Sequence, residues 1–238
     1  MEFLLNLDQS LYLFFNGFHT PLLDSFMMLF TGRFIWIPLY VALAMLLWHA
    51  FGTRRAVFFL MMAGVAILLT DQTCASLIRP LVQRLRPSNP ENPLSELAII
   101  VNGYRGGMYG FPSCHAANSF ALAVFIAMLL PRWRIVLFIT LWAAANSYSR
   151  LYLGVHYPGD LLVGAIIGSA FGFLCAKIAK RYESRIKPVD KPKSRTLMSF
   201  NTGFQTSEGR TMAIGITDAD LVIAVGIGII ACILIASL

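Results

Sequence analysis

Long apolar runs, separated by short polar connections, constrain this chain more than any other feature of its sequence. Several of the runs reach about 15–20 residues, the length that a helix needs to cross the hydrocarbon core of a bilayer. Charged residues make up only 13% of the chain, against roughly 25% in a soluble domain. One compact core cannot bury so much apolar surface, so the sequence predicts an all-α, polytopic membrane helix bundle. It excludes a soluble two-domain enzyme, a secreted disulfide scaffold and a disordered regulator.

The apolar runs predict five core transmembrane helices and a sixth at the C-terminus. The expected spans cover residues 34–51, 56–77, 115–130, 135–148, 158–176 and 221–238. Two short helices are expected to lie in the membrane interface before the first span, because Leu4, Leu7 and Leu11 recur at helical spacing and Thr20-Pro21 is typical of a helix start. The expected units are a membrane-embedded domain (1–180), a basic and polar cytoplasmic linker (181–218) and a C-terminal transmembrane helix (219–238).

Basic residues gather in the connections between spans and predict the orientation of the chain. Arg54 and Arg55 follow the first span, Arg132 and Arg134 follow the third, and a basic stretch over 177–195 follows the fifth. These groups share one side if the spans alternate, and the positive-inside rule makes that side cytoplasmic. The net charge of +7 is therefore explained by membrane topology, and no nucleic-acid partner is expected.

Arginines also occur on the opposite side, against the orientation rule, and they point to a chemical function. The side holds three segments that each lie at the end of a span: residues 79–87, 112–115 and 149–160. They carry guanidinium groups that suit phosphate oxygens, on Arg79, Arg86 and Arg150. Ser113 precedes a helix, so its hydroxyl and the free backbone N–H groups of Cys114 and His115 are expected to face the same anion.

Two histidines and an aspartate complete a candidate site for phosphoryl transfer. His115 and His156 each stand at a helix start, where one can attack phosphorus and the other can protonate the leaving oxygen. Asp160, four residues after His156, can accept a hydrogen bond from its ring and fix the tautomer. His19 and His49 lack such neighbours and are interpreted as structural. Each residue alone would be ordinary at a membrane surface, but their joint order on one side favours a site.

The three segments resemble the signature of the type-2 phosphatidic acid phosphatase superfamily. That signature reads Lys-x6-Arg-Pro, Pro-Ser-x-His and Ser-Arg-x5-His-x3-Asp; the second and third parts match fully, and Arg79 stands where the family usually has lysine. The resemblance spans residues 20–180 and implies that His156 is the nucleophile, oriented by Asp160, and that His115 is the general acid. It also implies phosphate contacts, without any metal or other cofactor, from Arg79, Arg86, Ser113, Cys114 and Arg150.

The implied reaction is metal-independent dephosphorylation of a membrane lipid phosphate or pyrophosphate through a phosphohistidine. Undecaprenyl pyrophosphate is the expected substrate, because the short N-terminal helices resemble those of bacterial undecaprenyl pyrophosphatases in this family. The alternatives are a phosphatidylglycerophosphate, phosphatidic acid or lipid A phosphatase and, among non-enzymes, a lipid-binding module or a transporter in which Asp71 marks a pathway. The expected location is the bacterial cytoplasmic (inner) membrane, with the site on the periplasmic side and membrane lipids as partners.

Overall fold

The computed structural model describes residues 2–185, 196–205 and 211–238, with side chains described outside residues 196–216. The expected all-α membrane bundle is confirmed in these residues. Four helical segments are long and apolar enough to cross a membrane: Phe34–Phe51, Thr53–Val82, Pro158–Arg185 and Asp218–Ser237. A further long helix, Trp133–Tyr152, joins them and carries polar residues toward its C-terminal end.

The helices follow the predicted spans closely. The second predicted span is a helix that continues into a π-helical turn, and a short helix follows it. Their bounds are α1 Glu2–Asn16, α2 Pro21–Phe30, α3 Ile37–Phe51, α4 Thr53–Gln72, α5 Arg79–Val82, α6 Cys114–Leu129, α7 Trp133–Tyr152, α8 Pro158–Arg185 and α9 Asp218–Ser237. Short 3-10 turns cover Phe34–Trp36, Pro93–Glu96 and Val101–Gly103, and a π-helical turn covers Thr73–Ile78. Two strands, β1 Thr196–Gln205 and β2 Thr211–Thr217, complete the described elements.

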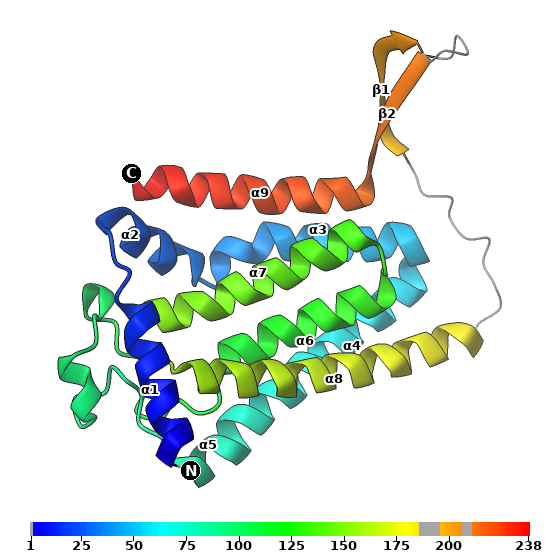
Figure 1. The fold of residues 1–238 in the computed structure, drawn as a ribbon. Coiled ribbons are helices and arrows are strands. Elements are labelled where there is room, and N and C mark those ends of the chain that lie inside the picture. Colours follow the sequence, from blue (N-terminus) through cyan, green and yellow to red (C-terminus); the bar gives the residue numbers. More distant parts are fainter. Residues whose placement is uncertain (1, 186–195, 206–210) are drawn as a thin grey trace.

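The long helices lie side by side, and the three predicted segments meet at one end of the bundle (Figure 1). Helix α6 packs against α4, α7 and α8, while α9 lies along α3 and also contacts α2. Helix α1 crosses the end at which the long α5–α6 connection gathers, and it contacts α7 and α8. The α3–α4 and α6–α7 junctions, with the basic pairs at 54–55 and 132–134, lie at the opposite end.

Close packing of α8 on α6 sets the geometry of the site. Gly164, Gly168 and Gly172 recur every four residues along α8 and are all buried. A Cβ at Gly168 would overlap the backbone of Ala117 on α6, so this approach requires glycine. Since α6 begins just after Ser113 and α8 begins at Pro158, the contact brings two of the three predicted segments together.

Helix α1 has a second face that the sequence analysis did not assign to any partner. Its expected apolar row is exposed as a membrane-interface helix requires, with Leu4 and Phe14 open over more than half of their surface. The opposite face packs inward, where Tyr12 and Asn16 are buried. Asn16 hydrogen-bonds the backbone of Ile99 from both ends of its amide, so α1 is attached to the loops of the site.

The polar linker contains a β-hairpin that the sequence analysis did not anticipate. Strands β1 and β2 pair antiparallel, with Phe200 opposite Ile214, and the hairpin stands away from the bundle. Both strands are rich in threonine and in aromatic or β-branched residues, which suit strands. Helix α8 continues to Arg185, past the expected boundary at 180. The basic residues of 187–195 that were used for orientation lie outside the described residues.

Candidate active site

The starts of α6 and α8 are joined directly by hydrogen bonds. Ser113 is the N-cap of α6, and its hydroxyl accepts a hydrogen bond from the backbone N–H of Ala116 at 3.5 Å. The backbone N–H of Ser113 donates to the carbonyl oxygen of Asp160 in the first turn of α8, at 3.0 Å. The second and third predicted segments therefore form one unit at this end of the bundle.

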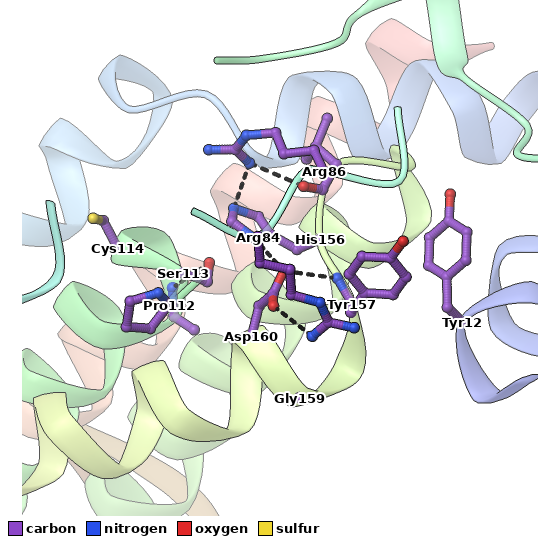
Figure 2. A network of polar contacts seen from close by, with 12 residues as sticks. Tyr12, Arg84, Arg86, Pro112, Ser113, Cys114, His156, Tyr157, Gly159 and Asp160 are labelled. Atoms are coloured by element: carbon purple, nitrogen blue, oxygen red, sulfur yellow. Dashed lines mark hydrogen bonds and ion pairs between the residues drawn. The ribbon is translucent and has the colours of Figure 1, made fainter. Parts of the chain in front are cut away.

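His156 lies at the centre of the unit and is held from both ring nitrogens (Figure 2). Its Nδ1 is 3.2 Å from Oδ2 of Asp160, and its Nε2 is 2.7 Å from Nη1 of Arg86. A guanidinium only donates and a carboxylate only accepts, so Nε2 carries the lone pair and Nδ1 carries the proton. The predicted pairing of Asp160 with His156 is thus present, and it fixes the tautomer that a nucleophile at Nε2 requires.

The surroundings of His156 favour the neutral ring. The side chain is almost fully buried, and this burial lowers the pKa of His156 well below its usual range, with further lowering by the charges of Arg86 and Arg150. Burial, together with Arg150 and Arg79, also lowers the pKa of Arg86, to about 10. Arg86 therefore stays charged at neutral pH, while the His156 lone pair stays available.

Of the three predicted arginines Arg86 contacts His156 directly, the charges of Arg79 and Arg150 also lower the pKa of His156, and all three arginines are partly unsatisfied. Arg79 donates to the carbonyl oxygen of Pro112 and to Sγ of Cys114, and Arg150 donates to Thr31 and Tyr104. Their Nε–H groups are buried without a hydrogen-bond partner among the described residues, in Arg79, Arg86 and Arg150 alike. Buried donors of this kind are costly, and an anion with several acceptor oxygens would pair them.

A π-helical turn aims the first of these arginines. Pro80 has no backbone N–H to donate to the preceding turn, and just before it the N–H of Arg79 bonds the carbonyl oxygen of Cys74, five residues earlier. Turns of this type are frequent at functional sites, where they re-aim side chains. At the end of this π-helical turn the Arg79 side chain reaches the start of α6, where it contacts Pro112 and Cys114.

His115 faces a separate space that adjoins the site. It lines a cavity of about 760 Å³ between α3, α4, α6 and α7, together with Arg33 and mainly apolar side chains such as Leu43, Leu60 and Leu122. A charge on His115 would lower the pKa of His156 further, as the charges of Arg86 and Arg150 do. Asp71 lines the same cavity and accepts a hydrogen bond from Asn118 on α6 at 3.2 Å, which gives this intramembrane acid a packing partner.

The sequence motifs assign no role to two polar residues at the site, Arg84 and Asp8. Arg84 contacts Oδ1 of Asp160 at 3.0 Å and Oδ2 of Asp8 at 2.7 Å, and Asp8 belongs to α1. Arg84 lies inside the variable part of the first motif, so the motif gave it no role. Asp8, Tyr12 and Asn16 recur every four residues on one helix face, a pattern that was visible but had no known target. Among the described residues no cluster of His, Cys, Asp and Glu could hold a metal ion.

Comparison with known proteins finds a matching family and relatives that cover most of this chain. The model of the PAP2 superfamily matches residues 56–183. A lipid A 4′-phosphatase of Bacteroides thetaiotaomicron is 51% identical over 187 residues, covering 79% of this chain and 83% of that protein. A lipid A 4′-phosphatase of Porphyromonas gingivalis is 32% identical over 191 residues, covering 78% of each chain.

A solved structure shares the fold. The crystal structure of a transmembrane PAP2-type phosphatidylglycerolphosphate phosphatase from Bacillus subtilis superposes with a TM-score of 0.55. It covers 79% of this chain and 89% of its own, at 22% sequence identity. At this identity the likeness concerns the helix arrangement alone.

Proposed function

The chain belongs to the PAP2 superfamily of lipid phosphatases, and we propose that it removes the 4′-phosphate of lipid A through a phosphohistidine on His156. The observation that carries this proposal is the His156–Asp160 pair, whose Nε2 carries no proton and accepts from Arg86, beside three arginines that keep unpaired Nε–H groups. This arrangement supports nucleophilic attack on phosphorus together with stabilisation of the charge on the transferred group.

The first half of the reaction forms the phosphoenzyme. Nη1 of Arg86 occupies the lone pair of Nε2, so substrate binding has to move this guanidinium onto a phosphate oxygen. Nε2 then attacks phosphorus, the N–P bond forms, and the bond from phosphorus to the lipid oxygen breaks. His115, which has to be protonated when the negatively charged phosphate is bound, gives this proton to the departing oxygen and becomes neutral. Asp160 stabilises the positive charge that develops on the ring of His156.

The second half releases inorganic phosphate. His115, now without its proton, takes a proton from a water molecule, whose oxygen attacks phosphorus as the N–P bond breaks. The electron pair of that bond returns to Nε2 of His156, and the free enzyme is restored. In both halves Arg79, Arg86 and Arg150 face the equatorial oxygens, where phosphoryl transfer concentrates negative charge.

Lipid A fits the comparisons better than undecaprenyl pyrophosphate. Two lipid A 4′-phosphatases match over most of this chain and most of their own length. The expectation of undecaprenyl pyrophosphate depended on the short N-terminal helices, and the contacts of α1 with the site loops provide another reason for them. The cavity beside His115 is large and apolar enough to take part of an acyl chain.

A side-by-side assay tests the substrate. Purified protein in detergent is given lipid A, undecaprenyl pyrophosphate and phosphatidylglycerophosphate at equal concentration, with and without EDTA, and phosphate release is measured. Release from lipid A is expected to exceed the other two by roughly tenfold or more in kcat/KM and to resist EDTA. Mass spectrometry of the product locates the lost phosphate. Faster release from undecaprenyl pyrophosphate would reject lipid A and restore the carrier lipid as substrate.

The protein is a multi-pass membrane protein, and we propose that its site faces the periplasm from the cytoplasmic membrane. The basic pairs at 54–55 and 132–134 lie at the end of the bundle opposite to His156, where the positive-inside rule favours the cytoplasm. The linker 181–218 would then be cytoplasmic, and α9 would return the chain to the periplasmic end.

Cysteine labelling in intact cells tests this orientation. After the native cysteines are replaced, Gly107→Cys in the exposed α5–α6 connection is expected to react with a membrane-impermeant thiol reagent added outside. Trp133→Cys, at the exposed first residue of α7, is expected to react only after the cells are permeabilised. A cysteine at Gly107 meets no neighbouring atom, so the substitution itself is tolerated. The reverse labelling pattern would place the site in the cytoplasm.

A further inference from the structure

The carboxylate that orients His156 is fully buried and needs a compensating charge. Oδ2 of Asp160 lies 3.2 Å from Nδ1 of His156 and accepts the backbone N–H of Tyr157 at 3.1 Å. Its other oxygen, Oδ1, is 3.0 Å from Nη1 of Arg84. Burying a charge away from water is unfavourable unless the charge is paired, so Arg84 helps to keep Asp160 ionised and fixed in place.

Both terminal nitrogens of Arg84 contact carboxylates: Nη1 contacts Asp160, and Nη2 contacts Asp8. The second of these nitrogens, Nη2, is 2.7 Å from Oδ2 of Asp8. The guanidinium lies over the ring of Tyr157, with Cζ 3.8 Å from the ring centroid. The fork of Arg84 therefore spans two carboxylates, as Figure 2 shows on the Asp160 side, while the three arginines of the phosphate site keep unpaired groups.

Asp8 binds the start of α8 as well as Arg84. Its Oδ1 accepts the backbone N–H of Gly159 at 2.7 Å, next to Asp160 in the first helical turn. A Cβ at Gly159 would lie 2.9 Å from Oδ2 of Asp8, so the approach depends on glycine. Asp8 thus accepts a hydrogen bond from a free backbone N–H at the start of α8. It also contacts Arg84, which in turn contacts Asp160.

Helix α1 is anchored in the register that this contact requires. Tyr12 packs edge-on against Tyr157, with ring centroids 5.3 Å apart, and its hydroxyl donates to the carbonyl oxygen of Gly154. One turn further, the amide of Asn16 donates to the carbonyl oxygen of Tyr152 at 3.1 Å. Both anchors are buried, and together they place Asp8 over the start of α8.

We propose that Asp8 and Arg84 are positioning residues for the phosphatase reaction: they hold Asp160, and through it His156, in the geometry of attack. The proposal deepens the proposed function, since it rests on the role of His156 as nucleophile. It makes the polar face of α1 part of the catalytic apparatus, although α1 contributes no group to the substrate.

Steady-state kinetics of detergent-purified variants test this relay, the chain of contacts from Asp8 through Arg84 and Asp160 to His156. Arg84→Met is expected to lower kcat by roughly 10–100-fold, the effect of losing a partner behind a functional ligand, with KM within about threefold of the wild type. Arg84→Lys is expected to recover part of kcat, because one charge remains near Asp160. Asp8→Asn is expected to lower kcat less, and adding it to Arg84→Met should cost little more, because residues that act as a unit are non-additive.

A matched control and a spectroscopic readout distinguish a positioning role of Arg84 from a general contribution to folding. The control is Arg134→Met, which breaks an ion pair with Asp220 at the far end of α7 and is expected to leave kcat and KM unchanged. Nitrogen-15 NMR of labelled histidine is expected to show the Nδ1–H tautomer of His156 in the wild type. In Arg84→Met the same ring is expected to show a mixture of tautomers.

The outcomes are distinct. A raised KM with unchanged kcat in Arg84→Met would assign Arg84 to the substrate and overturn the relay. Loss of thermal stability with normal kcat and an unchanged His156 tautomer would reduce the contact to a structural one and also overturn it. Wild-type protein that is inactive on every lipid phosphate, yet shows the tautomer change in Arg84→Met, would reject the proposed function while still showing that Arg84 positions Asp160 and His156.

Discussion

His156→Ala is expected to lower kcat/KM by roughly 10⁴-fold or more, the size of loss seen when a covalent enzyme loses its nucleophile. In the proposed reaction only His156 bonds to phosphorus, and both halves pass through that bond. Its Nε2 is free of a proton, and Asp160 and Arg86 fix the ring, so no other described side chain is prepared in the same way. The loss should appear on every phosphorylated substrate, whatever its leaving group.

Trapping of the acid-labile phosphoenzyme identifies the nucleophile directly. Wild-type protein mixed with radiolabelled substrate and quenched in base is expected to carry label on the peptide that contains residue 156. His156→Gln is the matched control, because its amide fills part of the buried space and keeps a hydrogen-bonding group beside Asp160. Label on the peptide that contains His115 would exchange the two roles, and a His156→Gln variant with normal turnover would reject covalent catalysis at this position.

The helix bundle and the gathering of the three motifs were predictable from the sequence because each depends on local information. Apolar runs of membrane-spanning length fix the helices, and strict alternation of spans brings segments 79–87, 112–115 and 149–160 to one end. The spacing of four residues from His156 to Asp160 also predicted their contact, which the structure shows at 3.2 Å. Such inferences need no knowledge of which helices are neighbours.

Contacts that depend on helix neighbours were not predictable in the same way. The face of α1 with Asp8, Tyr12 and Asn16 is regular in sequence, but its target lies roughly 80 to 150 residues away in the loops of the site. Gly168 shows the same limit, since a helix glycine is explained only when the backbone of Ala117 lies against it. The substrate was less predictable still, because the motif residues are suited to a phosphate group, which every candidate lipid carries.

His115 offers the test with the second largest effect, because the proposed reaction uses it first as an acid and then as a base. A lipid oxygen leaves poorly without a proton, so His115→Asn is expected to slow turnover of the lipid by roughly 10²–10⁴-fold. Nitrophenolate leaves well without one, so the same variant should still form phosphoenzyme from p-nitrophenyl phosphate. Its hydrolysis would then be slow, since the water molecule has lost its base.

Rapid mixing of His115→Asn with p-nitrophenyl phosphate should therefore release a burst of nitrophenol close to one equivalent per site, followed by slow turnover. The wild type serves as the control, and it is expected to show a smaller burst because its phosphoenzyme is hydrolysed quickly. His115 lies in the first turn of α6, whose start is hydrogen-bonded to Asp160 in the first turn of α8, so we expect one group at this place to serve both steps. An equal loss of rate on lipid and nitrophenyl substrates, without a burst, would contradict the acid role and leave His115 as a residue that only lines the cavity.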